Sequence, residues 1–238
     1  FLGIMQNEWA GAQAFSSFDT YLAPFVKADN LSYPEVKKCI ESFIYGVNTP
    51  SRWGTQAPFS NITLDWTVPD DMAEMNAIVG GRETDFKYKD CRKEMDMINK
   101  AFIETMVEGD ANGRGFQYPI PTYSITNDFD WSDTENNRLL FEMTSKYGTP
   151  YFSNYINSDM QPSDVRSMCC RLRLDLRELR KKTGGFFGAG ESTGSVGVVT
   201  INMPRIAYLA KDEADFYGKL DHMMDICARS LKTKREVI

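Results

Sequence analysis

Two adjacent cysteines, Cys169 and Cys170, are the side chains of this sequence best suited to chemistry. Neighbouring cysteines rarely form a disulfide, because the ring that they would close is strained. They also lack the two-residue gap with which a cysteine pair chelates zinc. Burial as a packing residue is the more common fate of a cytosolic cysteine, but a thiol that a tight loop exposes inside a pocket would be reactive. The spacing leaves both interpretations open.

A glycine-rich run, "GGFFGAGESTGSVG" at residues 184–197, follows the cysteines closely. Such a backbone lets N–H groups converge on a phosphate. The run is not a P-loop, because the Lys-Ser/Thr end is missing, and it precedes a predicted strand, which is the wrong order for a dinucleotide fingerprint. A flexible connection with positive-φ turns is the simpler interpretation.

The remaining polar candidates favour structural roles. His222 is the only histidine, so a Cys-His-Asp triad or a histidine-based metal site is not expected, and we predict a structural position for it. The basic residues between positions 166 and 182 could meet phosphates. Acidic residues are interleaved with them, which is more typical of a solvated, ion-paired face.

Composition describes an ordinary globular protein of 238 residues, 42% hydrophobic and 25% charged, which we expect to form one domain. The net charge of −6 argues against binding to nucleic acid or a membrane surface. Five cysteines, an odd number, fit free thiols in a reducing cytoplasm. No secretory signal or membrane-spanning segment is visible, so we predict a cytoplasmic location. The chain begins without Met and ends in a helix or its exit, so we expect a piece of a larger protein.

Hydrophobic periodicity predicts helices alternating with short apolar strands. The predicted helices cover residues 6–26, ending near Pro24, and residues 32–48, 91–108, 132–148 and 211–232. The predicted strands are "FSNITLDW", residues 122–125, "PYFSNYI" and "VGVVTINM" (196–203), while residues 171–182 fit either a helix or a charged hairpin arm. This alternation predicts an α/β fold with parallel strands.

Four motifs in order, "QNEWAGAQAFSSFDTYLAPF", "PFSNITLD", "RSMCCRLRLDLREL" and "TGSVGVVTINMPRIAYL", resemble the large subunit of anaerobic (class III) ribonucleoside-triphosphate reductase. The resemblance covers essentially the whole chain, as an internal segment of that larger enzyme. It implies part of the ten-stranded α/β barrel of the glycyl-radical enzyme and ribonucleotide reductase type, in which a loop carries a radical cysteine through two five-stranded parallel halves. Residues 1–238 would be a single segment of this catalytic barrel, with neither the N-terminal ATP-binding regulatory domain nor the C-terminal glycyl-radical domain.

The resemblance also implies the chemistry. Cys170 matches the thiyl-radical position, Met168 matches a methionine close to it, and Cys169 would be a packing neighbour. A glycyl radical in the C-terminal part would oxidise Cys170 to a thiyl radical, which abstracts the ribose 3′-hydrogen so that the 2′-hydroxyl leaves as water. Formate, or a dithiol system in some relatives, would supply the electrons. The product, a deoxyribonucleoside triphosphate, serves DNA replication.

Binding residues are expected from the same resemblance. Allosteric effectors, ATP or deoxynucleotides, would bind at a homodimer interface, with Lys27 as a phosphate contact. A radical-SAM enzyme would activate the full-length protein, and zinc would belong only to the C-terminal part, so no metal is expected in this segment. The candidates for the substrate triphosphate are Ser60, Asn61, Thr63, Gly190, Ser192, Thr193 and Ser195.

Several family features are absent from the 238 residues: the "RVCGYL"-type glycyl-radical loop, the C-terminal zinc-binding cysteine pairs and a second active-site cysteine. We therefore expect this chain to be inactive alone. The leading hypothesis is the catalytic-core segment of an anaerobic ribonucleotide reductase. The alternative is a catalytically inert nucleotide-binding or assembly fragment that needs a second chain with the glycyl radical. A third reading, a glycyl-radical lyase for small organic acids, fits the motifs less well.

Overall fold

The computed structural model describes Leu2, Gly197 and residues 13–50, 57–156, 165–169, 172–175 and 199–237, with the backbone alone for 165–169 and 172–175. Its centre is a four-stranded sheet in which every neighbouring pair is parallel, as predicted. The strands in spatial order are β1 (Gln13–Phe15), β2 (Ser60–Leu64), β5 (Ile120–Ile125) and β6 (Tyr151–Asn154).

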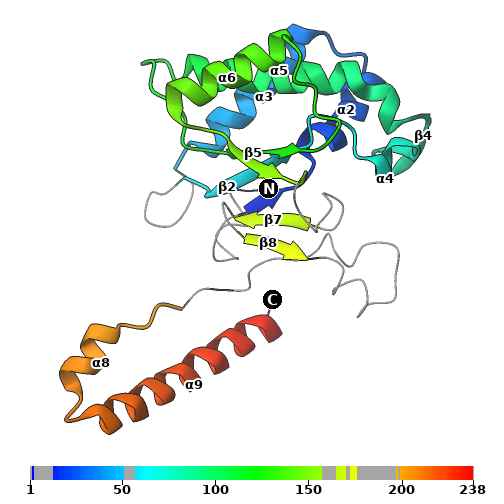
Figure 1. Ribbon diagram of the computed structural model, residues 1–238. Coiled ribbons are helices and arrows are strands. Elements are labelled where there is room, and N and C mark those ends of the chain that lie inside the picture. Colours follow the sequence, from blue (N-terminus) through cyan, green and yellow to red (C-terminus); the bar gives the residue numbers. More distant parts are fainter. Residues whose placement is uncertain are drawn as a thin grey trace.

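Four helices cover one face of this sheet (Figure 1). They are α2 (Phe18–Ala28), α3 (Tyr33–Val47), α5 (Arg92–Glu108) and α6 (Glu135–Tyr147), and the last three confirm the predicted helices. The core lies between the two layers, where Phe102 and Ile103 of α5 are fully buried with Ile62 and Leu64 of β2. Burial of each such side chain stabilises the fold by roughly 1.5–3 kcal/mol.

Local signals set the helix ends. At the start of α3, the Ser32 backbone N–H and hydroxyl both donate to Glu35 Oε2, at 2.8 and 2.6 Å. At the start of α6, the Thr134 hydroxyl accepts from the Asn137 backbone N–H at 3.2 Å. The same helix ends at Gly148, whose φ of 65° is a left-handed conformation that glycine adopts without strain.

The predicted helix over residues 6–26 is wrong in its bounds. Residues 13–15 form β1, and α2 begins only at Phe18 and continues past Pro24 to Ala28. A proline inside a helix costs about 3 kcal/mol, because it removes a backbone hydrogen bond. Ala23 and Val26 are buried against the core on either side of Pro24, and this packing offsets the loss.

An antiparallel hairpin that the sequence analysis missed lies beside α2. Its strands are β3 (Asn76–Val79) and β4 (Arg82–Lys87), preceded by α4 (Asp70–Ala73) and followed by the 3-10 turn η1 (Tyr88–Cys91). Gly80 and Gly81 connect the strands with φ of +59° and +77°. Two consecutive positive φ angles are what a tight hairpin turn requires, so the Gly-Gly pair was a usable signal.

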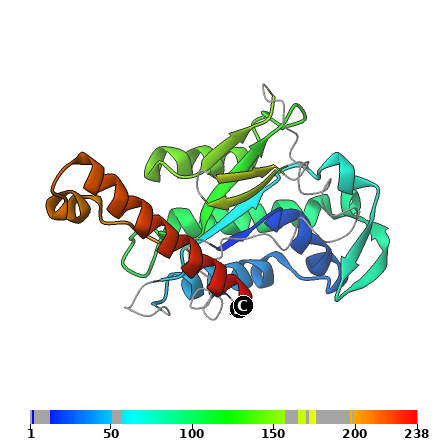
Figure 2. The same ribbon diagram turned by 90° about the horizontal axis from the view of Figure 1, so that it is seen from below.

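A second hairpin lies on the sheet face opposite the helices. β7 (Val165–Cys169) pairs antiparallel with β8 (Leu172–Asp175), so the hairpin reading of residues 172–175 is right and the helical one is wrong. β7 contacts β1 and β2. Figures 1 and 2 both place the hairpin against this face.

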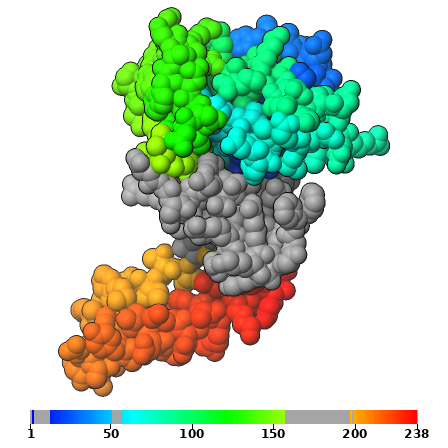
Figure 3. All heavy atoms as spheres, turned by 45° about the vertical axis from the view of Figure 1, so that its right-hand side comes forward, coloured from blue at the N-terminus to red at the C-terminus, as the bar shows by residue number. Residues whose placement is uncertain are grey.

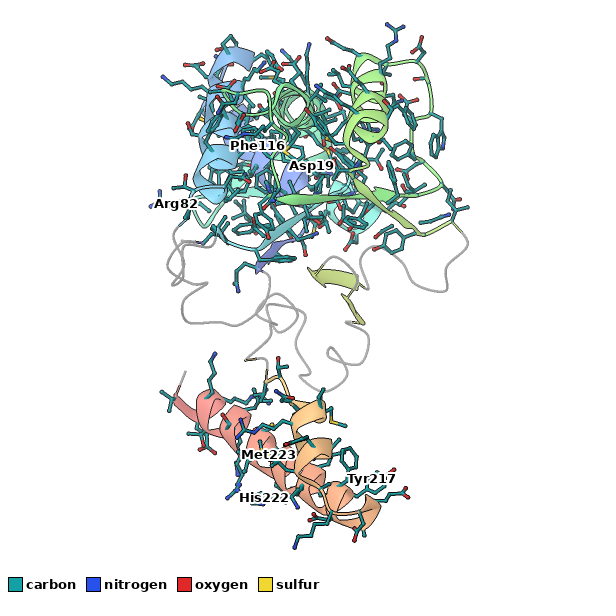
Figure 4. The ribbon with its side chains drawn as sticks, turned by 90° about the vertical axis from the view of Figure 1, so that its left-hand side faces the viewer. Asp19, Arg82, Phe116, Tyr217, His222 and Met223 are labelled. Carbon is teal, nitrogen blue, oxygen red and sulfur yellow. The ribbon has the colours of Figure 1, made fainter. Side chains whose placement is uncertain are left out.

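The C-terminal helices α8 (Met203–Leu209) and α9 (Glu213–Val237) pack on each other away from the sheet and its helices (Figures 1 and 3). The strand predicted for residues 196–203 is wrong: residues 199–202 carry no strand, and α8 begins at Met203. The Asn202 side chain caps α8 by accepting from the Arg205 N–H at 3.0 Å, and this polar cap ends the β-branched run. α9 confirms the predicted long helix. We had expected a structural role for His222, but its side chain is exposed on α9 and does not pack in the core (Figure 4).

Within the part of the chain that the structure describes, no helix has the length and apolar character needed to cross a membrane.

Candidate functional site: the polar face of the parallel sheet

The two faces of the sheet differ in chemistry. Along a strand, side chains alternate between faces, and residues paired between neighbouring strands share a face. Ile62, Leu64, Tyr123 and Ile125 face the helices and belong to the core. The opposite face carries a set of polar side chains, which we call the polar row: Asn61, Thr63, Thr122, Ser124 and Ser153.

Asn61 is the polar-row residue with unused hydrogen-bonding capacity. Its side chain is fully buried, and its Nδ2 donates to Thr122 Oγ1 at 3.3 Å. Its Oδ1 is buried and accepts no hydrogen bond within the described residues. A buried amide oxygen without a donor is costly, so a group that donates to it would bind favourably.

The other two predicted residues of this strand have different surroundings. The Thr63 hydroxyl accepts from the Ser17 backbone N–H at 2.8 Å, which ties the start of α2 to β2. The strand alternation places Ser60 on the helix side of the sheet, away from Asn61 and Thr63. Of the three, Asn61 is therefore the best placed to contact a ligand.

Of the two predicted reactive residues, only Met168 lies among the described residues, in β7 (Val165–Cys169). Met168 belongs to this strand, which contacts β1 and β2 on the polar face. Cys170 follows the last residue of β7 and lies outside the described residues. So do Gly190, Ser192, Thr193 and Ser195 of the glycine-rich run. The strand β7, which ends one position before Cys170, thus lies beside β2, the strand that carries Asn61 and Thr63.

Lys27 lies in the helical layer, apart from the polar row. Its Nζ is 3.6 Å from Glu94 Oε1 and 5.8 Å from the centroid of the Phe86 ring, and 33% of its side chain is exposed. An anion can therefore reach this ammonium group from solvent.

Asp19 organises the carboxyl end of β2, a feature that the sequence reading missed. This buried side chain accepts from the backbone N–H groups of Asp65 and Trp66 at 2.9 and 3.0 Å, and from Asn99 Nδ2 at 2.9 Å. Burial raises the pKa of Asp19, while these hydrogen bonds favour its charged form. Figure 4 shows Asp19 between the helices and the sheet. The turn after β2 is thereby fixed to both α2 and α5.

No group of three or more His, Cys, Asp or Glu side chains within the described ranges is arranged to hold a metal ion.

A family model described as anaerobic ribonucleoside-triphosphate reductase matches residues 1–238, the whole chain. The chain belongs to this family. The membership predicted from the four sequence motifs is thus confirmed, and the family of anaerobic ribonucleotide reductases is one of oxidoreductases.

Solved structures of the anaerobic ribonucleotide reductase from Thermotoga maritima have a similar fold. One with citrate in the active site matches with a TM-score of 0.54 and 20% identity. One with MES in the active site matches with a TM-score of 0.53 and 19% identity. One with dATP bound in the specificity site matches with a TM-score of 0.52 and 19% identity. The matches cover 100% of this chain and 41%, 38% and 39% of those chains. The chain thus spans about two fifths of the length of the reductase structures that it matches. No curated protein matches it significantly.

Proposed function

We propose that this chain is a single segment of the catalytic barrel of an enzyme that converts ribonucleoside triphosphates to 2′-deoxyribonucleoside triphosphates. The observation that carries the proposal is the family match over all 238 residues. In the proposed reaction the ribose 2′-hydroxyl leaves as water, formate is oxidised to CO2, and one proton is consumed. Two electrons from formate thus replace the C–O bond with a C–H bond.

Cys170 is the proposed reactive thiol, and Met168 its neighbour. The support is positional, since β7 crosses the polar face of the sheet and ends one residue before Cys170. A glycyl radical held by the remainder of the protein would supply the oxidising power. This segment would contribute the thiol and exclude water around it.

The substrate would lie over the polar row. The free Oδ1 of Asn61 is suited to accept from a ligand hydroxyl, while the Thr63 hydroxyl holds the strand in place. For the triphosphate, the proposed contacts remain those of the glycine-rich run: Gly190, Ser192, Thr193 and Ser195.

Lys27 is the proposed contact for the phosphates of an ATP or deoxynucleotide effector. The reductase of Thermotoga maritima was solved with dATP in a specificity site. In this chain the partly exposed Lys27 ammonium could exchange its 3.6 Å contact with Glu94 for a phosphate. Effector and substrate would then change each other's affinity by the same factor.

The proposed partners follow from the family. We expect a cytoplasmic homodimer, a radical-SAM activating enzyme that acts on the full-length protein, and zinc only in the C-terminal part. A second candidate function is a nucleotide-binding fragment that is inert without another chain. It would apply to these 238 residues when separated from the remainder of the enzyme.

Product analysis tests both candidates. The 238-residue chain alone and the complete, anaerobically activated enzyme would each be incubated with CTP and formate, and dCTP and CO2 would be measured. We expect equal amounts of dCTP and CO2 from the complete enzyme and none from the chain alone. Failure of the activated complete enzyme to form dCTP with any reductant would contradict the reductase proposal.

A further inference from the structure

Two residues at the carboxyl edge of the parallel sheet have a left-handed backbone conformation although neither is glycine. Ser17, two residues after β1, has a φ of 52°, and Trp66, two residues after β2, has a φ of 66°. Residues other than glycine rarely adopt this conformation, and a bulky residue such as Trp adopts it only where its surroundings impose it. Glycine would make both turns without strain, so specific contacts must hold Ser17 and Trp66 in place.

The Asp19 carboxylate is the centre of these contacts, and it is fully buried. Its Oδ1 accepts from the backbone N–H groups of Thr20 and Asp65 at 3.0 and 2.9 Å. Its Oδ2 accepts from the Trp66 backbone N–H and from Asn99 Nδ2 at 3.0 and 2.9 Å. An ionised carboxylate has about four acceptor positions, whereas the single oxygen of an Asn side chain has two. An amide at this position could therefore serve only part of this set of donors.

Two further hydrogen bonds join the start of α2 to β2 and the turn after it. The Ser17 backbone N–H donates to Thr63 Oγ1 at 2.8 Å, and the buried Thr20 hydroxyl donates to Asp65 Oδ2 at 2.6 Å. Together with the hydrogen bonds of Asp19, they attach the carboxyl end of β2 to α2 through residues 63, 65 and 66. The position of this strand end is therefore set by polar contacts as well as by core packing.

β2 is the strand on which the proposed site most depends. It carries Asn61 and Thr63 of the polar row, and it contacts β7, the strand that ends one residue before Cys170. Asp19 lies between the helices and the sheet, where it is fully buried and cannot touch a ligand on the polar face (Figure 4). Any influence of Asp19 on the reaction must therefore act through the backbone of β2.

We propose that Asp19 is a positioning residue of the reductase reaction. Its carboxylate holds the turn after β2 and thereby sets the position of the polar row relative to β7. The inference rests on the proposed function, because it assumes that a ribonucleotide reacts over the polar row. Misplacement of reacting groups by about 1 Å can lower a rate about 100-fold. Loss of the carboxylate should therefore slow the reaction more than it weakens substrate binding.

Kinetics of the complete, anaerobically activated enzyme test the assignment. Asp19→Asn keeps the size of the side chain but removes one acceptor oxygen, and Thr20→Val removes only the hydroxyl that donates to Asp65. Thr134→Ala, which removes the cap at the start of α6, is the control for a general loss of stability. For each variant, the kcat of dCTP formation is divided by the glycyl-radical content from electron paramagnetic resonance. The Kd of CTP is measured by calorimetry.

We expect Asp19→Asn to lower the kcat per glycyl radical at least about 10-fold, and Thr20→Val to lower it about 3-fold. The Kd of CTP should change by no more than about 3-fold, and Thr134→Ala should keep the wild-type kcat per radical. Unchanged kcat in Asp19→Asn, or an equal fall in Thr134→Ala, would show that Asp19 only stabilises the fold and would overturn the inference. A loss confined to CTP affinity would overturn it as well.

Thr20→Val decides the matter by the same criteria if Asp19→Asn does not fold, because it leaves the carboxylate and its four hydrogen bonds in place. The wild-type enzyme separates this inference from the proposed function. Normal dCTP formation by the wild type with unchanged kcat in the variants overturns the role of Asp19 alone, whereas a wild-type enzyme that forms no dCTP contradicts the reductase proposal itself.

Discussion

Single buried polar side chains set the geometry of the sheet's carboxyl edge. Asp19 is the clearest case, because its carboxylate accepts from the backbone of the turn that follows β2 and from Asn99 on α5. Asn61 differs from it, since its buried Oδ1 has no hydrogen-bond partner among the described residues. The Asp19 carboxylate therefore holds this edge together, and the Asn61 amide oxygen remains available to a ligand.

Removing the Asp19 carboxylate should destabilise the fold strongly. Asp19→Ala leaves the N–H groups of Asp65 and Trp66 buried without an acceptor, which costs about 1–3 kcal/mol for each such group. Urea unfolding of the 238-residue chain measures the loss. Asp29→Ala, at the exposed end of the same helix, should change stability by no more than about 0.5 kcal/mol. Equal effects of the two variants would show that the Asp19 network is unimportant.

The cysteines should differ sharply in reactivity. Burial and the nearby Glu94 carboxylate raise the pKa of the Cys91 thiol from 9.0 to about 11. The folded state therefore holds this proton more tightly than the unfolded state does, and its contribution to stability is complete below pH 9 and lost as the pH rises to about 11. At pH 8, iodoacetamide followed by peptide mass spectrometry should label the exposed Cys39 at once and Cys91 only in denaturant. Rapid labelling of Cys91 in the native protein would contradict the burial of its thiol.

Helix caps, which can be recognised in the sequence, stabilise individual helices of this fold. Thr134→Ala removes the acceptor for the Asn137 N–H at the start of α6, and we expect a loss of about 1 kcal/mol. Ser145→Ala, on the same helix, removes a hydroxyl that bonds only to a carbonyl of its own helix and should be nearly neutral. Chemical denaturation of both variants gives the comparison, and a neutral Thr134→Ala would mean that packing alone defines the start of α6.

The sequence predicted those elements in which local pattern and burial agree. α3, α5 and α6 have helical periodicity, recognisable ends and a buried face, so propensity and packing select the same structure. In its described part, the strand predicted at residues 196–203 failed because residues 199–202 form no strand and Asn202 caps α8 instead. The extent of α2 was missed because core packing outweighs the preference of Pro24 to end a helix.

The candidate site was only partly visible in the sequence. Asn61 and Thr63 were identified through a motif, and the strand register was needed to separate them from Ser60 and to add Thr122 and Ser124. Asp19 could not have been found, because its partners at residues 65, 66 and 99 are distant in the chain and meet only after folding.

At the scale of the whole molecule, the chain divides into a layered part with a dense core and a C-terminal helix pair with little burial. α5 contributes eight buried residues to the core, whereas none of the residues of α9 is buried. On α9 the side chains of Tyr217 and Met224 are 53% and 54% exposed. Helices with little tertiary packing are only marginally stable in water.

Amide hydrogen exchange on the isolated chain should reveal this division. We expect the amides of α5 to exchange only through global unfolding and those of α9 to exchange orders of magnitude faster, since little buried surface opposes local opening. Mass spectrometry of peptic peptides from both helices makes the comparison within one sample. Equal protection of α5 and α9 would contradict the division.

The central claim is that Cys170, and not its neighbour, carries the radical chemistry of a ribonucleotide reductase. The most direct test compares dCTP formation by complete, anaerobically activated enzyme carrying Cys170→Ser or Cys169→Ser, with the same content of glycyl radical by electron paramagnetic resonance. We expect no detectable dCTP from Cys170→Ser and substantial turnover from Cys169→Ser. Turnover that survives Cys170→Ser would contradict the account.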